Sequence, residues 1–226
     1  MNDINKAHLG IKNNLYYFYS ICGLVGLNIL SNIINYQYTD ATKELTRQLT
    51  DKYKDSPQTL ESISGLLKES AELSLPLIEK FNAQLQVTSF FSVLSTILFI
   101  TAIVFLAKTV LNYYGVYSKS KEGKTLVTPA GAAWGWFIPI LNLFRPFNTT
   151  NEVLNGETVP EMDSQISLAK FSFYAAVILP FVNLFFATFT PTAINIAVSS
   201  VAALLFLYSS YLMYQVHVRI FEKQNQ

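Results

Sequence analysis

Four apolar runs constrain the fold of this chain more than any other feature of its sequence. Each has about the twenty residues that a helix needs to cross a hydrocarbon core about 30 Å thick. They hold a single charged residue, Lys170 near the start of the third run, so burying them in lipid removes almost no charge from water. The runs are Leu15–Tyr36, Val87–Ala107, Leu168–Phe189 and Thr192–Tyr214. They predict an all-α integral membrane protein with four transmembrane helices.

The composition agrees with a chain that lies in a lipid bilayer. Hydrophobic residues make up 51% of it and charged residues only 14%. A nucleic-acid partner is not expected, because the 16 Lys and Arg are scattered and nearly matched by 15 acids rather than gathered in a basic stripe. The single cysteine, Cys22, lies in an apolar run and is expected to be a small buried hydrophobe.

Basic residues in short segments predict the orientation of the bundle. The first run is too long for a signal-peptide core and has no small-residue cleavage site after it, so it is expected to be an uncleaved anchor. With four spans, residues 1–14, the basic loop 108–127 and the tail 215–226 all fall on one side, and all three carry Lys or Arg. The positive-inside rule therefore places both termini in the cytoplasm.

Residues 37–86 are predicted to form amphipathic helices on the opposite, extracytoplasmic side. Apolar residues recur at helical spacing before and after a break at Ser56 and Pro57. They are Ala41, Leu45, Leu49, Tyr53, Leu60, Ile63 and Leu67. Pro76 is expected to kink the second helix, which is able to continue into the second span. Two interpretations remain open: the hairpin caps its own bundle, or its stripes pack against other copies or a partner.

The stretch "WGWFIPILNLFRP" at Trp134–Pro146 is strongly apolar but too short to cross a bilayer. Residues 128–147 are therefore expected to form a short kinked helix that is re-entrant or interfacial, although a spanning placement stays open. Thr128 can cap it, with Pro129 at the first helical position. Because kinked backbone at membrane depth must be covered by protein or water, this helix should pack against the bundle.

Individual side chains within this stretch suit such a helix. Trp134 and Trp136 fit the headgroup boundary, and Pro139 should produce the kink. Arg145 is expected at the C-terminal end of the helix, where a cation is favourable, and Pro146 should end it. Two roles for Arg145 are open: it closes the helix by binding the last carbonyls, or it grips an anionic lipid headgroup.

The sequence "TPAGAAWGWFIPILNLFRPFNTTNEVLNG" resembles the signature of a bacterial family of multi-pass membrane proteins known only as a domain of unknown function. The pattern runs Trp-x-Trp-Phe-x-Pro-x-x-Asn-Leu-x-Arg-Pro, and the resemblance spans about Leu85 to Gln224. The matching positions are Pro129, Trp134, Trp136, Pro139, Asn142, Arg145, Pro146 and Phe147. The resemblance implies a multi-pass protein of the bacterial cytoplasmic membrane, with no established activity to carry over.

Polar residues on the first span form a face at helical spacing. Asn28, Ser31, Asn32 and Asn35 must face protein or water rather than lipid. They indicate hydrogen bonds between helices or, alternatively, a pore lined by amides. "FIPILNLF" and "ILPFVNLF" also share Pro-x-x-Asn-Leu-Phe, a pairing typical of some transporters but explained as well by reused helix packing.

Reactive side chains are few, and no catalytic residue, metal site or cofactor is expected. His8 and His217 lie near the chain ends, and one cysteine cannot complete a zinc ligand set. Acids gather in the expected loop 148–167, namely Glu152, Glu157, Glu161 and Asp163. They indicate a solvated loop with Asp163 capping the next helix or, alternatively, a divalent-metal or phosphate site.

Three functional hypotheses follow, and the sequence names no ligand or pathway. The first and preferred one is a non-enzymatic scaffold or sensor subunit that forms homo-oligomers and engages a protein partner. The second is an oligomeric channel or carrier for a small solute, based on the polar face. The third is a membrane enzyme that uses the acidic loop.

Overall fold

The computed structural model describes residues 3–54, 60–136, 145–156, 162–186 and 192–224. Over these ranges the chain consists of helices and short connections, without a strand. The helices are α1 (Asp3–Tyr53), α2 (Leu60–Ser120), α3 (Pro129–Trp134), α5 (Arg145–Gly156), α6 (Asp163–Phe186) and α7 (Thr192–Gln224). Within the described ranges, α1, α2, α6 and α7 are long and apolar enough to cross a membrane. The prediction of an all-α membrane protein with four spanning helices is confirmed.

The first, second and fourth apolar runs each lie inside one helix, and α6 contains the described part of the third. Helices α1, α2 and α7 are much longer than their runs. With 51 residues, α1 is about 77 Å long at 1.5 Å per residue, more than twice the thickness of a hydrocarbon core. The helices also continue into segments that were expected to be loops or tails, since α2 reaches Ser120 and α7 reaches Gln224. These continuations are rich in Lys, Glu, Gln and Tyr, which are compatible with helix faces that contact water.

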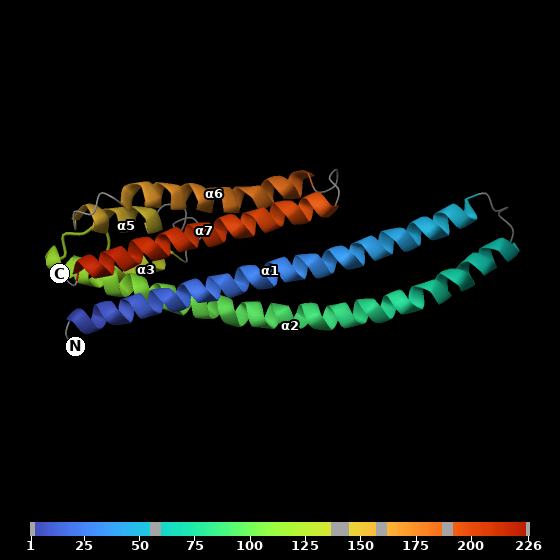
Figure 1. The fold of residues 1–226 in the computed structure, drawn as a ribbon, viewed down its shortest axis with the longest axis horizontal. Coiled ribbons are helices and arrows are strands. Elements are labelled where there is room, and N and C mark those ends of the chain that lie inside the picture. The colour runs from blue at the N-terminus through green and yellow to red at the C-terminus, as the bar shows by residue number, and fades with distance from the viewer. Residues whose placement is uncertain (1–2, 55–59, 137–144, 157–161, 187–191, 225–226) are drawn as a thin grey trace.

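The segment 37–86 consists of the far ends of α1 and α2 and the connection between them (Figure 1). The expected continuation of the second helix into the membrane is confirmed, because α2 runs through Pro76 without a break. In Figure 1 the two helices extend beyond the ends of α6 and α7. The hairpin therefore projects away from the bundle, which differs from the interpretation as a cap over it.

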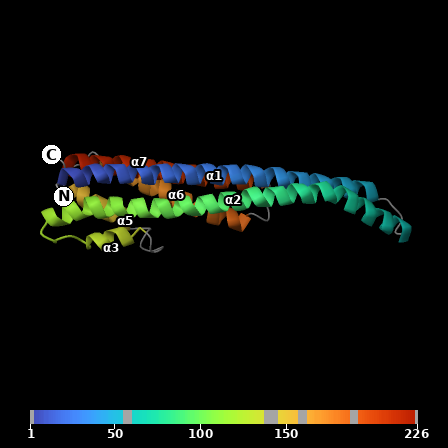
Figure 2. The ribbon, with the colours of Figure 1, turned by 90° about the horizontal axis from the view of Figure 1, so that it is seen from below.

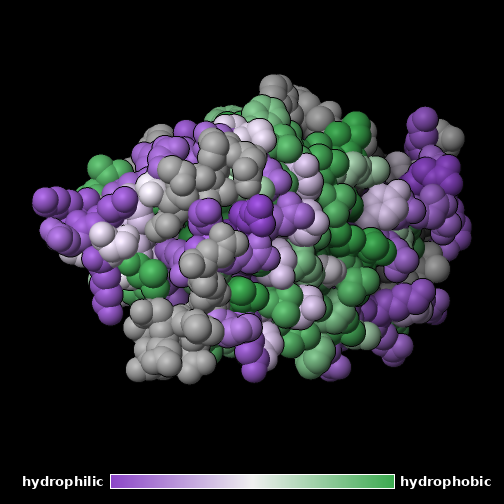
Figure 3. All heavy atoms as spheres, turned by 60° about the vertical axis from the view of Figure 1, so that its left-hand side comes forward, coloured by the Kyte–Doolittle hydropathy of each residue, from purple (hydrophilic) through white to green (hydrophobic). Residues whose placement is uncertain are grey.

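The four long helices lie side by side in the order α2, α1, α7, α6. Helix α1 packs along both α2 and α7, and α6 packs along α7, so α2 and α6 lie on the outer sides (Figures 1 and 2). Both chain termini lie at one end of the bundle, called here the terminal end, and the hairpin marks the other. Figure 3 shows a band of hydrophobic side chains between polar ends, as expected for a protein surrounded by lipid.

The best-packed core lies at the terminal end. Tyr113 and Val216 are completely buried there, and Ile220 joins them. At Gly10 a Cβ atom would lie only 2.3 Å from the ring of Phe221, so glycine permits the close approach of α1 and α7. Toward the hairpin end, by contrast, large apolar side chains such as Phe185 are exposed, which suits contact with lipid.

The motif segment differs from the single kinked helix expected over residues 128–147. The predicted start is confirmed, because Thr128 Oγ1 accepts a hydrogen bond from the Gly131 amide at 3.1 Å and Pro129 follows as the first residue. Helix α3 ends at Trp134, however, and Arg145 begins α5 instead of ending a helix. Pro146 stands in the first turn of α5, where its missing N–H leaves no hydrogen bond unmade.

Two further expectations concern residues around this segment. Pro139 and Asn142 lie in residues 137–144, outside the described ranges. The expected loop 148–167 is largely helical, because α5 occupies residues up to Gly156 and α6 begins at Asp163. Helix α5 forms because it is amphipathic and buries Val153 and Leu154 against the core. Asp163 lies in the first turn of α6, where a carboxylate is favourable.

Candidate functional site

A groove runs between α2 and α6, with α1 and α7 as its floor. It holds two cavities lined mainly by α1, α2, α6 and α7, and Trp136 and the start of α5 add to the lining of the first. Phe206 lines both, so the cavities adjoin along the groove. The first lies nearer the terminal end and is called the terminal-side cavity, and the second is the hairpin-side cavity.

The terminal-side cavity has a volume of about 380 Å³ and a mainly aromatic and aliphatic lining. Phe99, Phe147 and Phe173 contribute rings from α2, α5 and α6. Few polar side chains reach it, and the Ser209 hydroxyl is already used, since it donates to the Ala169 carbonyl at 2.8 Å. No charged side chain is among the described residues that line it, so this lining suits hydrocarbon.

The hairpin-side cavity is larger, about 660 Å³, and distinctly more polar. Its hydrogen-bonding side chains come from three helices and are all uncharged. They are Asn28, Ser31, Thr88, Ser92, Ser95 and Ser199. The hydroxyl residues on α2 and α7 were not singled out from the sequence, because isolated Ser and Thr in an apolar run give no signal of a shared cavity.

The predicted polar face of α1 is divided between two environments. Asn28 and Ser31 line the hairpin-side cavity. Asn32 Nδ2 donates to Asn28 Oδ1 at 3.2 Å and so supports that side chain. Asn35 lies further toward the hairpin, where its Oδ1 accepts a hydrogen bond from Gln84 Nε2 at 2.9 Å. This last contact is a hydrogen bond between helices, which was one of the two expected explanations of the face.

The described motif residues surround the terminal-side end of the groove. Trp136, Pro146 and Phe147 line the terminal-side cavity, whereas Trp134 is 64% exposed. At Gly135 a Cβ atom would lie 2.9 Å from the Cβ of Arg145, so glycine lets the end of α3 meet the start of α5. Arg145 thus packs where the two short helices join.

A hydrogen-bonded cluster fastens the connection after α2 to α5. The buried Tyr114 hydroxyl donates to Glu152 Oε2 at 2.6 Å, and the Leu126 amide donates to Glu152 Oε1 at 2.9 Å. The Val127 amide also donates to the Tyr114 oxygen at 3.4 Å. Glu152 was expected in a solvated acidic loop, but both its carboxylate oxygens accept hydrogen bonds from other parts of the chain.

His217 lies at the centre of a second buried cluster. Its Nδ1 is 3.3 Å from Asn14 Oδ1, and Asn14 Nδ2 donates to the Tyr214 carbonyl at 2.9 Å. The imidazole stacks on Tyr113 at 4.9 Å and meets the ring of Trp136 edge-on at 6.0 Å. His217 Nε2 and Trp136 Nε1 are buried and have no hydrogen-bond partner in the described part of the chain. The contact with Asn14 spans the whole sequence, so periodicity could not have predicted it.

Groups that could hold a metal ion were sought among the described residues. No three His, Cys, Asp or Glu side chains come together there. Glu157 and Glu161, which belong to the predicted acidic group, lie outside the described ranges.

The projecting hairpin carries an exposed apolar surface, called here the hairpin stripe. It consists of Ile63, Leu67, Ile78 and Leu85 on α2, with exposed fractions of 51, 62, 49 and 47%. At 100° per residue these side chains fall within an arc of about 60° and extend over about 33 Å. Phe81, at the same helical angle as Ile63, meets Tyr38 of α1 at 5.1 Å, so α1 lies along one edge of the stripe.

Comparison with known proteins finds a family that part of the chain resembles. No curated protein and no solved structure matches the chain. A family model, described as a domain of unknown function (DUF4328), matches residues 76–172. This range contains most of α2, all of α3 and α5 and the first part of α6. It begins before the resemblance seen in the sequence and ends well before Gln224. Residues 76–172 are therefore similar to the DUF4328 family, a domain of unknown function.

Proposed function

We propose that this protein is a non-enzymatic subunit of a membrane assembly, in which copies of the chain join through the hairpin stripe and present the hairpin to a protein partner. The observation that supports this proposal is the stripe itself, an apolar face about 33 Å long on a hairpin that projects beyond the rest of the bundle. Ile63 and Leu67 lie outside the candidate span that begins at Ile78, and exposed apolar surface outside a bilayer is typical of an interaction site. The role is that of a scaffold or sensor subunit.

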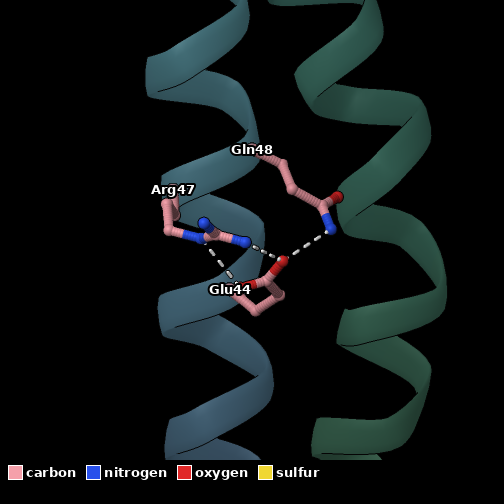
Figure 4. A network of polar contacts seen from close by, with 3 residues as sticks. All are labelled: Glu44, Arg47 and Gln48. Carbon is pink, nitrogen blue, oxygen red and sulfur yellow. Dashed lines mark hydrogen bonds and ion pairs between the residues drawn. The ribbon is translucent and has the colours of Figure 1, made fainter.

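The charges around the stripe favour a second copy of the same chain as its occupant. Figure 4 shows that Arg47 and Gln48 both donate to Glu44 on α1, with Arg47 Nη2 2.9 Å from Glu44 Oε1. Lys52 on α1 forms an ion pair with Glu69 on α2. Because acids and basic residues are interspersed over residues 37–86, eight against six, repulsion between two identical hairpins is small, and neither demands a partner of one charge.

The experiment is site-directed crosslinking in native membranes. Cys22, the single cysteine, is half-buried and is first replaced by Ser. A Leu67→Cys chain should then form a disulfide-linked dimer under mild oxidation. The matched control is Glu72→Cys, which is exposed on the same helix about 140° away from Leu67 and should stay monomeric.

A second variant tests the energetics of the same contact. Leu67→Glu places an unpaired charge in the proposed interface and should weaken self-association by at least about 100-fold in a vesicle FRET titration. Equal crosslinking of both cysteines, or unchanged association of Leu67→Glu, would contradict the proposal. The mass of the crosslinked species would also reveal a defined second protein.

The proposed location is the bacterial cytoplasmic membrane with both termini in the cytoplasm. Lys119, near the end of α2, and Lys223, in the last turn of α7, lie on the terminal-end portions of their helices. Basic residues favour the cytoplasmic side, so the hairpin would project from the opposite face. In the cysteine-free chain, Lys119→Cys should resist a membrane-impermeant maleimide in intact cells, whereas Lys43→Cys on the hairpin should react. The reverse labelling would invert the proposed orientation.

A channel or carrier is the second candidate function, and the hairpin-side cavity favours it. Asn28 and five hydroxyl side chains line that cavity, whereas Asn35 does not. Asn28→Leu should therefore abolish solute flux into vesicles while Asn35→Leu leaves it unchanged. Flux that survives Asn28→Leu would remove this cavity from any pore. The enzyme hypothesis has less support, since Glu152 is engaged by Tyr114 and Leu126.

A further inference from the structure

We propose that the groove between α2 and α6 is a binding site for one uncharged membrane amphiphile, a molecule with a long hydrocarbon chain and a head bearing hydroxyl or carbonyl groups. The chain lies in the terminal-side cavity and the head lies in the hairpin-side cavity. This site is separate from the hairpin stripe, so it stands independently of the proposed assembly.

The dimensions of the groove fit such a molecule. The two cavities have volumes of about 380 and 660 Å³ and meet at Phe206, and both volumes lie in the range of small-molecule sites. Along α7 the combined lining runs from Ser199 to Met213, a distance of about 21 Å at 1.5 Å per residue. That exceeds half of a hydrocarbon core about 30 Å thick, so it accommodates a single lipid chain.

The position of the groove gives it access to lipid. Its walls, α2 and α6, carry exposed apolar side chains on their outer faces, among them Ile100 at 55% and Phe181 at 62%. Helices α2 and α6 lie on opposite outer sides of the bundle and do not pack against one another along their length (Figure 1). A lipid in the surrounding bilayer therefore enters sideways, without leaving the hydrocarbon.

The polarity of the lining determines which part of the ligand lies where. The terminal-side cavity is lined mainly by rings and aliphatic groups, which favour a hydrocarbon chain. The hairpin-side cavity offers the Asn28 amide and the hydroxyls of Ser92 and Ser95, which suit a head that forms hydrogen bonds.

The absence of charge from the lining excludes an ionic head. Neither cavity is lined by Asp, Glu, Lys or Arg among the described residues. Asn28 lies about 12 Å inside the end of the apolar run at Tyr36, at 1.5 Å per residue. At that depth a phosphate would be buried without a counter-charge, whereas a hydroxyl or ester is satisfied by amide and hydroxyl partners.

The test uses the whole chain in phosphatidylcholine vesicles. Two probes are compared at equal mole fraction: a diacylglycerol and a phosphatidic acid that carry the same photoreactive acyl chain. The diacylglycerol should label the protein about fivefold more strongly, the ratio expected when the head gains one hydrogen bond between uncharged groups. Its adducts should map to residues 99–106 of α2 and 206–213 of α7.

Matched variants separate the site from general contact with lipid. Ile103 lines the terminal-side cavity, whereas its neighbour Val104 is 43% exposed and does not. Ile103→Trp fills the cavity and should reduce diacylglycerol labelling by about tenfold, while Val104→Trp leaves it unchanged. Equal labelling of the two variants would overturn the site.

A second pair of variants tests where the head group binds. This pair also tests the binding site itself if Ile103→Trp does not fold. Asn28→Leu should bring diacylglycerol and phosphatidic acid labelling to the same level. Asn35→Leu makes the same chemical change on the same helix outside the cavity, so the preference should persist. A preference that survives Asn28→Leu, or equal labelling of the unaltered chain by both probes, would overturn the proposed selectivity.

Discussion

The contact between Tyr114 and Glu152 should hold the start of α3 in place. Tyr114→Phe removes one hydroxyl from a completely buried ring. The lost interactions are the hydrogen bond to Glu152 Oε2 at 2.6 Å and the weaker one from the Val127 amide at 3.4 Å. A hydrogen bond to a charged group contributes about 1.5–3 kcal/mol, and its short length places this one among the stronger examples.

The consequence should be local opening rather than global unfolding. Glu152 keeps its hydrogen bond from the Leu126 amide at 2.9 Å, and the aromatic ring still fills its place. The amides of Ala132 and Gly135 depend on α3, because they donate to the Thr128 and Gly131 carbonyls at 2.8 and 3.1 Å. A loss of 1.5–3 kcal/mol in local stability should accelerate their exchange by about 10- to 150-fold.

The assay is hydrogen–deuterium exchange by mass spectrometry on the full chain in lipid nanodiscs, followed on peptides that cover residues 126–135. Tyr19→Phe is the control, since Tyr19 is 59% exposed and the same atom is removed. Glu152→Gln keeps an acceptor but loses the charge, so its effect should be smaller than that of Tyr114→Phe. Exchange of these peptides that is unchanged in Tyr114→Phe would refute the role given to this contact.

Two further predictions concern the packing of the long helices. Gly10→Ala should destabilise the protein by about 1–3 kcal/mol in thermal unfolding, because the new methyl group meets the Phe221 ring. Gly26→Ala on the same helix has nothing within 4 Å of the new Cβ and should instead stabilise it by about 0.5–1 kcal/mol, so a loss there would contradict the argument. Asn14→Leu should cost about 1–3 kcal/mol, because it removes the partner of His217 in a buried site, and a neutral result would show that the pairing contributes nothing.

Long apolar runs with almost no charge were sufficient to predict the membrane-spanning architecture. The four runs are long, so their length alone distinguishes spanning helices from buried strands or core helices, and the described part of each falls within one helix. The cap formed by Thr128 and Pro129 was also predictable, because it depends on adjacent residues only. Local signals of this kind are fully contained in the sequence.

The remaining details depend on contacts that no local pattern records. Arg145 was expected at the C-terminal end of a helix, where a cation is favourable, with Pro146 ending that helix. Proline is equally favourable in a first turn, however, and α5 begins at Arg145. The groove arises from how α1 and α7 pack, so Asn28 and Ser199 share a cavity although they lie far apart in the chain. His217 and Asn14 meet for the same reason.

The continuity of α1 has a mechanical consequence. This helix runs from Asp3 to Tyr53 as one element of 51 residues without a proline, so it contains no joint between the extremities of the molecule. A rod about 77 Å long that pivots by about 5° near its middle moves each tip by roughly 3 Å, in opposite directions. A displacement of the hairpin therefore also moves the opposite end of α1, near Gly10 and Asn14, because the helix turns about the point where the bilayer holds it.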